Sequence, residues 1–252
     1  MKLVSHEVKA STTLGVLILH GFTSGRATVE AVVPQAEALG LPWRLPQLRG
    51  HWTTPADLEG VTYKHMLMDA QAAFGELRDE VDRVAVVGLS VGGLLALDLA
   101  LQQPAGLDSL VVLVPALRYV NPLARFAPLV ARVMRTAKND VALAFTDRSL
   151  ADRAGNYTHF PSATFVTLAQ AGKRVEAGLP RIGAPLLVIG SRRDRVVQPQ
   201  VAQLVHDRAG SRDKTLAWFE QSGHELLLDC EADAVAERIG AFLQERAGAN
   251  KG

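Results

Sequence analysis

Five short apolar runs, separated by stretches of helical character, constrain the fold of this chain more than any other feature. They are Val16–Leu19, Val84–Val87, Leu110–Val114, Leu186–Ile189 and Thr215–Phe219. The runs are continuous rather than alternating, as is typical of strands that are covered on both faces of a sheet. Strands that alternate with helices form a parallel sheet with right-handed crossovers. The sequence therefore predicts an α/β fold, with a mostly parallel sheet flanked by helices.

Helical signals lie between the runs. Thr54–Asp57 places a capping threonine before a proline and an acid, which is typical of a helix start. Further helices are predicted over residues 63–77, 92–102 and 162–176. A last, amphipathic helix is predicted from the i, i+4, i+7, i+8 spacing of Val235, Ile239, Phe242 and Leu243.

One segment lacks this alternation of strands and helices. No clear strand lies between Pro115 and Pro185, and a structureless loop of about seventy residues is improbable in a compact domain. We therefore interpret residues 118–160 as a small helical insertion. Residues 1–117 and 161–252 would then form one core, which suits the length of 252 residues.

Composition excludes several classes of protein. The net charge is +1, so no basic surplus is available for binding nucleic acid. The single cysteine, Cys230, cannot form an internal disulfide or a zinc cluster. No apolar stretch is long enough for an integral membrane segment, and the first twelve residues lack the apolar core of a secretory signal. We therefore expect a cytoplasmic location.

The sequence Gly88-Leu89-Ser90-Val91-Gly92 matches the pattern G-x-S-x-G between a predicted strand and a predicted helix. This is the setting of a nucleophile elbow, in which a strained turn lifts a serine hydroxyl above the sheet. Side chains at the two glycine positions are expected to clash in such a turn. The alternative is a β–α turn without chemistry. The context favours Ser90 as a nucleophile.

A serine hydroxyl needs a base to become nucleophilic. The chain has seven histidines: His6, His20, His51, His65, His159, His206 and His224. Only His224 lies in a short loop just after a late strand, whereas His20 lies beside the backbone expected to build an oxyanion hole. We interpret His224 as the base. The alternative is a solvated loop histidine.

The base needs an acid that fixes its tautomer. Asp194 follows the fourth apolar run and so is expected at the carboxyl end of the sheet. The chain order Ser90, Asp194, His224 is that of α/β-hydrolases. Asp194 as a capping residue or an arginine partner is the alternative.

Backbone amides near Ser90 are candidates for an oxyanion hole. His20-Gly21-Phe22-Thr23 follows the first run, so the Phe22 and Val91 N–H groups form the natural donor pair. The Phe22 ring is expected at the floor of the substrate site. A simple strand-ending turn is the alternative.

Four motifs together resemble a known family: Leu19–Thr23, Gly88–Gly93, Asp194–Val197 and Ser222–His224. They are similar to those of small bacterial carboxylesterases and monoacylglycerol lipases of the α/β-hydrolase superfamily, over residues 14–245. The resemblance implies an α/β-hydrolase fold, and a small helical cap that agrees with the insertion at 118–160. Relatives usually have Gly-His-Gly where this chain has Gly50-His51-Trp52, so Trp52 is expected to reshape the mouth of the site.

The predicted function is that of a serine carboxylic-ester hydrolase, with a Ser90-Asp194-His224 triad and an acyl-enzyme intermediate. Its substrate would be a small ester or lipid, either a short- to medium-chain ester or a monoacylglycerol, and no cofactor or metal is expected. The apolar cap residues predicted to cover the acyl chain are Phe126, Leu129, Val130 and Met134. Ordinary packing of these residues is the alternative. Thioester or C–C bond hydrolysis, or ligand binding without turnover, are alternative functions on the same fold.

Overall fold

The computed structural model describes residues 13–249. The predictions for His6 and for the first twelve residues lie outside this range. Within it, six parallel strands form one sheet in the order β2-β1-β3-β4-β7-β8. Their bounds are β1 Leu14–Leu19, β2 Trp43–Arg44, β3 Arg83–Leu89, β4 Leu107–Leu113, β7 Leu186–Ser191 and β8 Lys214–Phe219. Each of the five predicted strands is confirmed.

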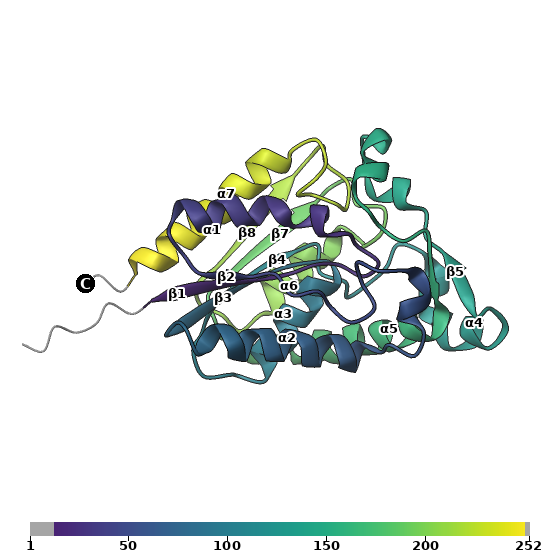
Figure 1. The fold of residues 1–252 in the computed structure, drawn as a ribbon, viewed down its shortest axis with the longest axis horizontal. Helices are drawn as coiled ribbons and strands as arrows, with labels where there is room; N and C mark the ends of the chain where they lie inside the picture. Colours follow the sequence, from purple (N-terminus) through teal and green to yellow (C-terminus); the bar gives the residue numbers. More distant parts are fainter. Residues whose placement is uncertain (1–12, 250–252) are drawn as a thin grey trace, which may run out of the picture.

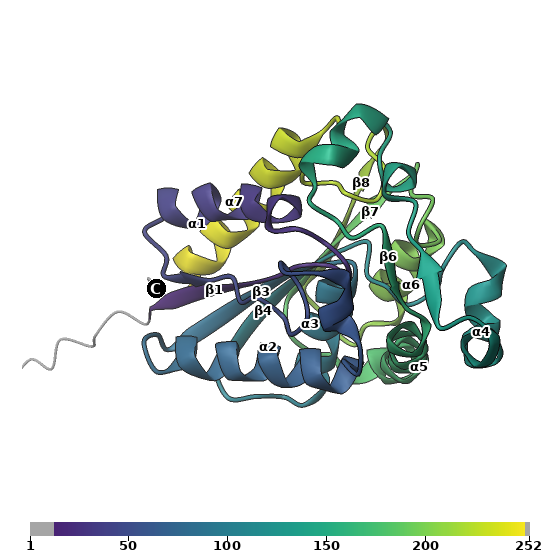
Figure 2. The ribbon, with the colours of Figure 1, turned by 45° about the vertical axis from the view of Figure 1, so that its right-hand side comes forward.

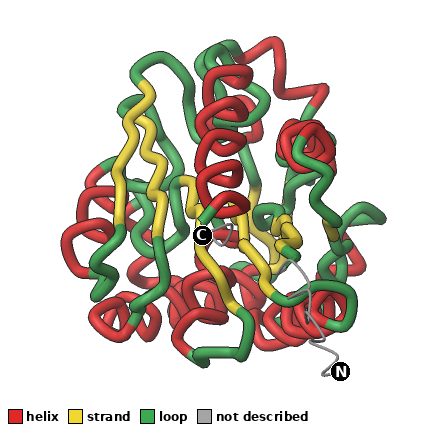
Figure 3. Tube along the Cα trace, turned by 90° about the vertical axis from the view of Figure 1, so that its left-hand side faces the viewer, coloured by secondary structure: helices red, strands yellow, loops and turns green. Residues whose placement is uncertain are grey.

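Helices cover both faces of this sheet. One face packs against α1 (Val33–Ala38) and α7 (Ala232–Gly248). The opposite face packs against α2 Tyr63–Arg78, α3 Val91–Leu101, α5 Ser162–Gly178 and α6 Gln200–Arg208. Figures 1 and 3 show the sheet between these two layers. Since helices cover both faces, the predicted α/β class, a parallel sheet flanked by helices, is confirmed.

The predicted helices agree with the structure to within a few residues. The expected helix start at Thr54 is a 3-10 turn, Pro55–Leu58, with a capping box between Thr54 and Asp57. A second threonine, Thr62, then begins α2. The other 3-10 turns outside the insertion are Arg26–Thr28, Glu30–Val32 and Leu179–Arg181. The capping pattern at Thr54 therefore marks the start of a short 3-10 turn, while α2 has its own cap at Thr62.

The segment 118–160 leaves the sheet after β4 and returns at the start of α5. It contains α4 and several 3-10 turns, and also a two-stranded antiparallel pair that the sequence did not predict. Its elements are the 3-10 turn Pro122–Phe126, α4 Ala127–Val133, β5 Thr136–Lys138, the 3-10 turns Val141–Ala144 and Arg148–Arg153, and β6 His159–Pro161. Figure 2 shows α4 at the margin of the molecule, away from the six-stranded sheet.

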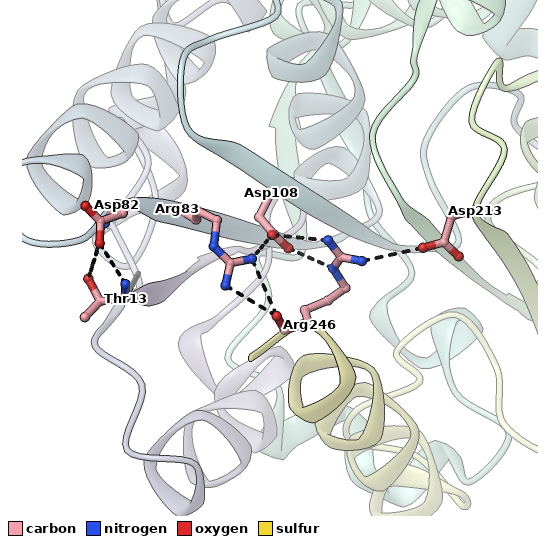
Figure 4. Close-up of polar contacts among 6 residues, drawn as sticks. All are labelled: Thr13, Asp82, Arg83, Asp108, Asp213 and Arg246. Atoms are coloured by element: carbon pink, nitrogen blue, oxygen red, sulfur yellow. Dashed lines mark hydrogen bonds and ion pairs between the residues drawn. The ribbon is translucent and has the colours of Figure 1, made fainter. Parts of the chain in front are cut away.

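A charged network ties α7 to the amino end of the sheet (Figure 4). Arg83 at the start of β3 and Arg246 near the end of α7 both pair with Asp108 of β4. The Arg246 Nε–Asp108 Oδ2 distance is 3.0 Å, and Arg246 also reaches Asp213 at 3.5 Å. Beside this network, the Asp82 carboxylate accepts a hydrogen bond from the Thr13 amide at 2.8 Å.

The strand order reverses direction between β1 and β3. In open parallel sheets the loops diverge at such a point and leave a crevice beyond the carboxyl ends of the strands. The loops that follow β1 and β3 carry the Phe22 and Ser90 motifs. Across residues 13–249, no helix has the length and apolar character needed to cross a membrane.

Candidate active site

Ser90 occupies a strained turn between β3 and α3. Its backbone has φ 56° and ψ −113°, a region that costs free energy for any residue with a Cβ. Neighbouring strands hold the turn: the Ser90 amide donates to the Leu113 carbonyl at 2.9 Å, and the Ser90 carbonyl accepts from the Ala116 amide at 3.1 Å. This is the geometry of a nucleophile elbow.

The two glycines of the motif are required by close backbone approach. A Cβ on Gly88 would lie 2.2 Å from the Gly92 carbonyl oxygen, and a Cβ on Gly92 would lie 2.0 Å from the Leu19 carbonyl oxygen. Both distances are well inside van der Waals contact. The predicted clash at these positions is confirmed, and it explains why the turn tolerates no side chain there.

His224 and Asp194 form a buried hydrogen-bonded pair. The His224 Nδ1 and Asp194 Oδ2 atoms are 2.7 Å apart. The other oxygen of Asp194 accepts the Val196 and Val197 amides at 2.8 and 2.9 Å. Burial acts to lower the pKa of His224, but the Asp194 carboxylate outweighs it, so the pKa lies above the usual value of 6.5. The aspartate therefore favours the cationic imidazolium.

Two backbone amides close to Ser90 have no protein acceptor. Within residues 13–249, neither the Phe22 nor the Val91 N–H donates to another residue. Both residues line the same cavity as Ser90 and His224. The Thr23 hydroxyl, in contrast to these amides, already has an acceptor, because it donates to the Phe22 carbonyl at 2.6 Å. The amides, rather than this hydroxyl, are free to stabilise an oxyanion.

Two buried neutral histidines hold the Phe22 loop. His20 Nε2 accepts the Leu48 amide at 3.2 Å, and His51 Nε2 accepts the Thr23 amide at 3.1 Å. Burial lowers the pKa of His20 to about 3 and that of His51 to about 4. The sequence did not predict this role of His51, although the motif Gly50-His51-Trp52 was the available signal. In the structure, Gly50 and Trp52 flank it with positive φ.

Trp52 does not reach the cavity. Its ring packs on His20 with a centroid separation of 4.8 Å, and it is absent from the residues that line the cavity in the described chain. Among the described residues, Trp52 therefore contacts His20 and not the mouth of the cavity, where the sequence predicted it.

The insertion braces both loops of the site. Asn156 Oδ1 accepts the Gly25 amide of the Phe22 loop at 2.9 Å, and Asn156 Nδ2 donates to Glu225 beside His224 at 2.8 Å. The Ala144 carbonyl accepts the His224 amide at 2.7 Å. One asparagine therefore connects the loop after β1 with the loop after β8. Sequence analysis missed it because no local pattern marks such a bridge.

Glu225 is a buried acid in this bridge. It is 3% exposed, and its Oε2 atom has no hydrogen-bond partner among residues 13–249. Burial raises its pKa, against the opposing effects of His224 and Asn156. A carboxyl group in such a place favours its neutral form.

The cavity has a volume of about 470 Å³. The 3-10 turn before α4, α4 itself and the start of α5 contribute mainly apolar lining: Leu123, Ala124, Ala127, Val130, Met134 and Phe165. The loop after β1, the insertion and the loop after β8 contribute polar lining: Ser24, Asn139, Asn156 and Glu225. Asp194 lies behind His224 and does not line the cavity.

The four predicted cap residues divide into two pairs. Val130 and Met134 line the cavity. Phe126 and Leu129 do not, and are 46% and 62% exposed. Successive positions of a short helix face different sides, so apolar composition alone could not separate the two pairs. Across the described residues, no cluster of three or more histidine, cysteine, aspartate or glutamate residues is arranged to hold a metal ion.

Comparison with known proteins agrees with this geometry. Residues 11–231 match the Hydrolase_4 family, described as serine aminopeptidase, S33. The chain belongs to this family. It is similar to a thermostable monoacylglycerol lipase from Bacillus sp. (strain H-257), with 29% identity over 93% of this chain and 92% of the relative.

Two further relatives support the same assignment. A carboxylesterase from Bacillus subtilis (strain 168) is 23% identical over 91% of this chain and 92% of its own length. A solved structure of the metagenome-derived lipolytic enzymes LipS and LipT has a TM-score of 0.86 and 28% identity, covering 94% of this chain and 95% of that one. The protein is thus an α/β-hydrolase, a serine hydrolase of the esterase and monoacylglycerol lipase type.

Proposed function

We propose that the protein hydrolyses carboxylic esters with Ser90 as nucleophile, His224 as base and Asp194 as the acid that orients it. The hydrogen bond between His224 and Asp194, on a cavity that also contains the elbow serine, carries this proposal. Every required group comes from a different loop, and all of these loops lie at the carboxyl end of the sheet, where α/β sites form.

The reaction would proceed in two halves. The Ser90 Oγ attacks the ester carbonyl while His224 takes its proton, and the Phe22 and Val91 amides stabilise the oxyanion. His224 then gives that proton to the leaving alcohol, which leaves an acyl-enzyme. Water, deprotonated by His224, attacks the acyl group, and the proton returns to Ser90 as the acid departs.

The cavity lining supports a substrate with one apolar and one polar part. Val130 and Met134 would cover the acyl chain, while Asn156 and Glu225 lie beside the base that protonates the leaving alcohol. This matches a monoacylglycerol or a short- to medium-chain ester. In this proposal, residues 118–160 act as a cap over a core of residues 1–117 and 161–252.

A substrate panel tests the proposal. Hydrolysis is measured for p-nitrophenyl esters of increasing chain length, for a monoacylglycerol, and for matched thioesters. We expect oxygen esters to be preferred, and a fluorophosphonate probe to label Ser90. Retention of the wild-type rate by Ser90→Ala would exclude the mechanism, and a preference for thioesters would exclude the substrate class.

A further inference from the structure

Glu225 is the most deeply buried acid of the described chain, and the proposed reaction gives it no role. Only one of its two carboxyl oxygens is bonded. Oε1 accepts a hydrogen bond from Asn156 Nδ2 at 2.8 Å, whereas Oε2 is buried without a partner among residues 13–249. A buried polar atom without a partner costs free energy. On the wall of a cavity, such an atom indicates a place where a ligand supplies the missing hydrogen bond.

The other buried acids of residues 13–249 are satisfied within the protein. They are Asp98, Asp108, Asp194 and Asp229. Each of them accepts at least two hydrogen bonds from phenol, guanidinium, imidazole or amide groups, and none of their buried oxygens lacks a partner. Among the buried acids of this part of the chain, Glu225 alone therefore combines deep burial with an open hydrogen-bonding position.

Glu225 directly follows His224, and it lines the cavity together with Ser24 and Asn156. We call Ser24, Asn156 and Glu225 the polar end of the cavity. Asn156 holds it together, because its Oδ1 atom accepts the amide of Gly25, the residue after Ser24, at 2.9 Å. The polar end therefore joins the loop after β1, the insertion and the loop after β8 at one place beside the base.

The polar end also borders the nucleophile. A Cβ placed on Gly21 would lie 2.7 Å from Ser24 Oγ and 3.4 Å from Ser90 Cβ, so both serine side chains lie near the same point. In the proposed reaction His224 gives its proton to the leaving alcohol, so the alcohol part of the ester has to lie beside this base. The apolar lining from α4 and the start of α5 is then left for the acyl chain.

The Glu225 carboxyl is suited to bind a hydroxyl group. Burial raises its pKa, and the carboxylates of Asp194 and Asp229 act in the same direction. His224 and Asn156 oppose this rise. A neutral carboxyl has one O–H donor besides its acceptor positions, and since Oε1 is engaged by Asn156, the donor belongs to Oε2. The terminal torsion of a glutamate side chain is broad, so the carboxyl can turn toward a ligand oxygen.

We propose that Glu225 is a substrate-binding residue which, as a neutral carboxylic acid, donates a hydrogen bond to a free hydroxyl on the alcohol part of the ester. The enzyme would then select monoesters of diols and polyols over esters of simple alkanols of equal size. An ester without that hydroxyl leaves Oε2 unpartnered in the complex, which disfavours it. This inference rests on the proposed function, because it needs the leaving alcohol to lie beside His224.

Two substrates of equal size test the inference. Hydroxyethyl octanoate and propyl octanoate share the acyl chain, and differ by a hydroxyl in place of a methyl group. We expect the wild-type ratio of kcat/KM, hydroxyethyl over propyl, to exceed the ratio of their rates with hydroxide by at least about ten-fold. A general loss of activity cancels from this ratio, because both esters use the same triad. A wild-type ratio equal to that with hydroxide would overturn the proposal.

Variants of Glu225 identify the origin of the preference. Glu225→Leu should bring the ratio close to that with hydroxide. Glu225→Gln should keep most of the preference, because the amide is neutral and still has an N–H donor. Glu220→Leu, at an exposed acid of the same loop, is the matched control and should keep both the rate and the ratio of the wild type.

Two results with these variants would also overturn the proposal. Equal slowing of both esters in Glu225→Leu would limit the carboxyl to holding Asn156. A loss of preference in Glu225→Gln as large as in Glu225→Leu would show that a charged carboxylate is required. The thermal midpoint shows whether each variant is folded, and if Glu225→Leu does not fold, the wild-type ratio and Glu225→Gln still decide.

The same assays separate this inference from the proposed function. If neither ester is hydrolysed, or if Ser90→Ala keeps the wild-type rate, the proposed function is wrong and the role of Glu225 falls with it. If both esters are hydrolysed through Ser90 with no preference beyond that of hydroxide, the proposed function stands and only the role of Glu225 is wrong.

Discussion

Asp108 at the amino end of the sheet and Asp194 at its carboxyl end are equally buried, with 8% and 5% of their surfaces exposed. Their partners differ. Asp108 faces the guanidinium groups of Arg83 and Arg246, whereas Asp194 faces two backbone amides and the imidazole of His224.

The difference lies in whether the partner can exchange a proton. A guanidinium keeps its charge at every accessible pH, so the Asp108 network can only hold β3, β4 and α7 together. An imidazole titrates near neutrality, so the Asp194 pair can also move a proton. We expect changes at the amino end to affect stability, and changes at the carboxyl end to affect the reaction.

Among the variants, Ser90→Ala should show the largest difference between its effect on the reaction and its effect on stability. We expect kcat for a p-nitrophenyl ester to fall by about 10⁴-fold or more, because the substitution removes the proposed nucleophile from the elbow. The thermal midpoint should stay close to that of the wild type. A large loss of stability would mean that the serine supports the fold as well as the reaction.

Asp194→Asn tests the acid itself. Asparagine keeps the shape but not the charge that stabilises the imidazolium, so kcat should fall by about 10³- to 10⁴-fold. Asp152→Asn, at an exposed acid of the insertion, serves as the matched control and should keep its rate. If both variants retained activity, the acid would have to be sought elsewhere.

Asp108→Asn should show the opposite pattern. Removing the carboxylate leaves Arg83 without its counterion and Arg246 with only the exposed Asp213, so the free energy of unfolding should fall by about 2–4 kcal/mol. Asp213→Asn, on the exposed side of the same network, should cost less than about 1 kcal/mol. Both are measured by urea unfolding, with kcat/KM expected to stay within two-fold. A kcat/KM loss in Asp108→Asn without unfolding would contradict the division between the two ends.

Lowering the pH should affect the two ends of the sheet over different pH ranges. The pKa of His224 is raised above 6.5. As the pH is lowered, kcat/KM should therefore begin to fall while the pH is still above 6.5, by about ten-fold per unit once the base is protonated. Burial acts to raise the pKa of Asp108, but Arg246 and Arg83 hold it below 3.8. The unfolded chain therefore takes up the proton first, and the stability from Asp108 is complete above about pH 4 and lost as pH falls through the folded pKa.

Unfolding of the wild type and of Asp108→Asn across the same pH range measures this contribution. The difference in unfolding free energy should stay constant between about pH 7 and pH 5 and shrink below about pH 4. A difference that changes in parallel with kcat/KM would show that the two ends are coupled.

His51→Gln should give the smallest effect. Without the imidazole, the Thr23 amide loses a fixed acceptor and the neighbouring Phe22 amide is less well placed. We expect kcat to fall by about five-fold with KM unchanged, well below the loss caused by removing an oxyanion donor outright. Because the pKa of His51 is lowered to about 4, the pH profile near neutrality should keep its shape. A shifted profile would contradict a purely positioning role.

The sequence predicted those features that depend on local chemistry. Continuous apolar runs marked the central strands, and glycines at 88 and 92 marked a turn whose backbone contacts exclude a Cβ. The two-residue strand β2 was missed because Trp43–Arg44 has no apolar run of its own. It pairs only because β1 offers a parallel neighbour.

Contacts between distant segments could not be predicted. The Asn156 bridge joins residues 131 and 69 positions away, and no spacing in the sequence indicates it. The insertion contains a strand pair because Thr136–Lys138 finds His159–Pro161, again across a long separation. Helix composition likewise did not reveal that Phe126 and Leu129 face outward while Val130 faces the cavity.

The Asn156 bridge bears on how such enzymes can be recombined. The bounds of the segment, residues 118 and 160, suggest two positions at which one cap could be exchanged for another. Yet Ala144 and Asn156 bond directly to the loops that hold His224 and Gly25. A chimera joined at residues 118 and 160 would lose these bonds together with the original cap. Grafting only residues 120–135 would transplant α4 and its surface while keeping the bonds of Ala144 and Asn156 to these two loops.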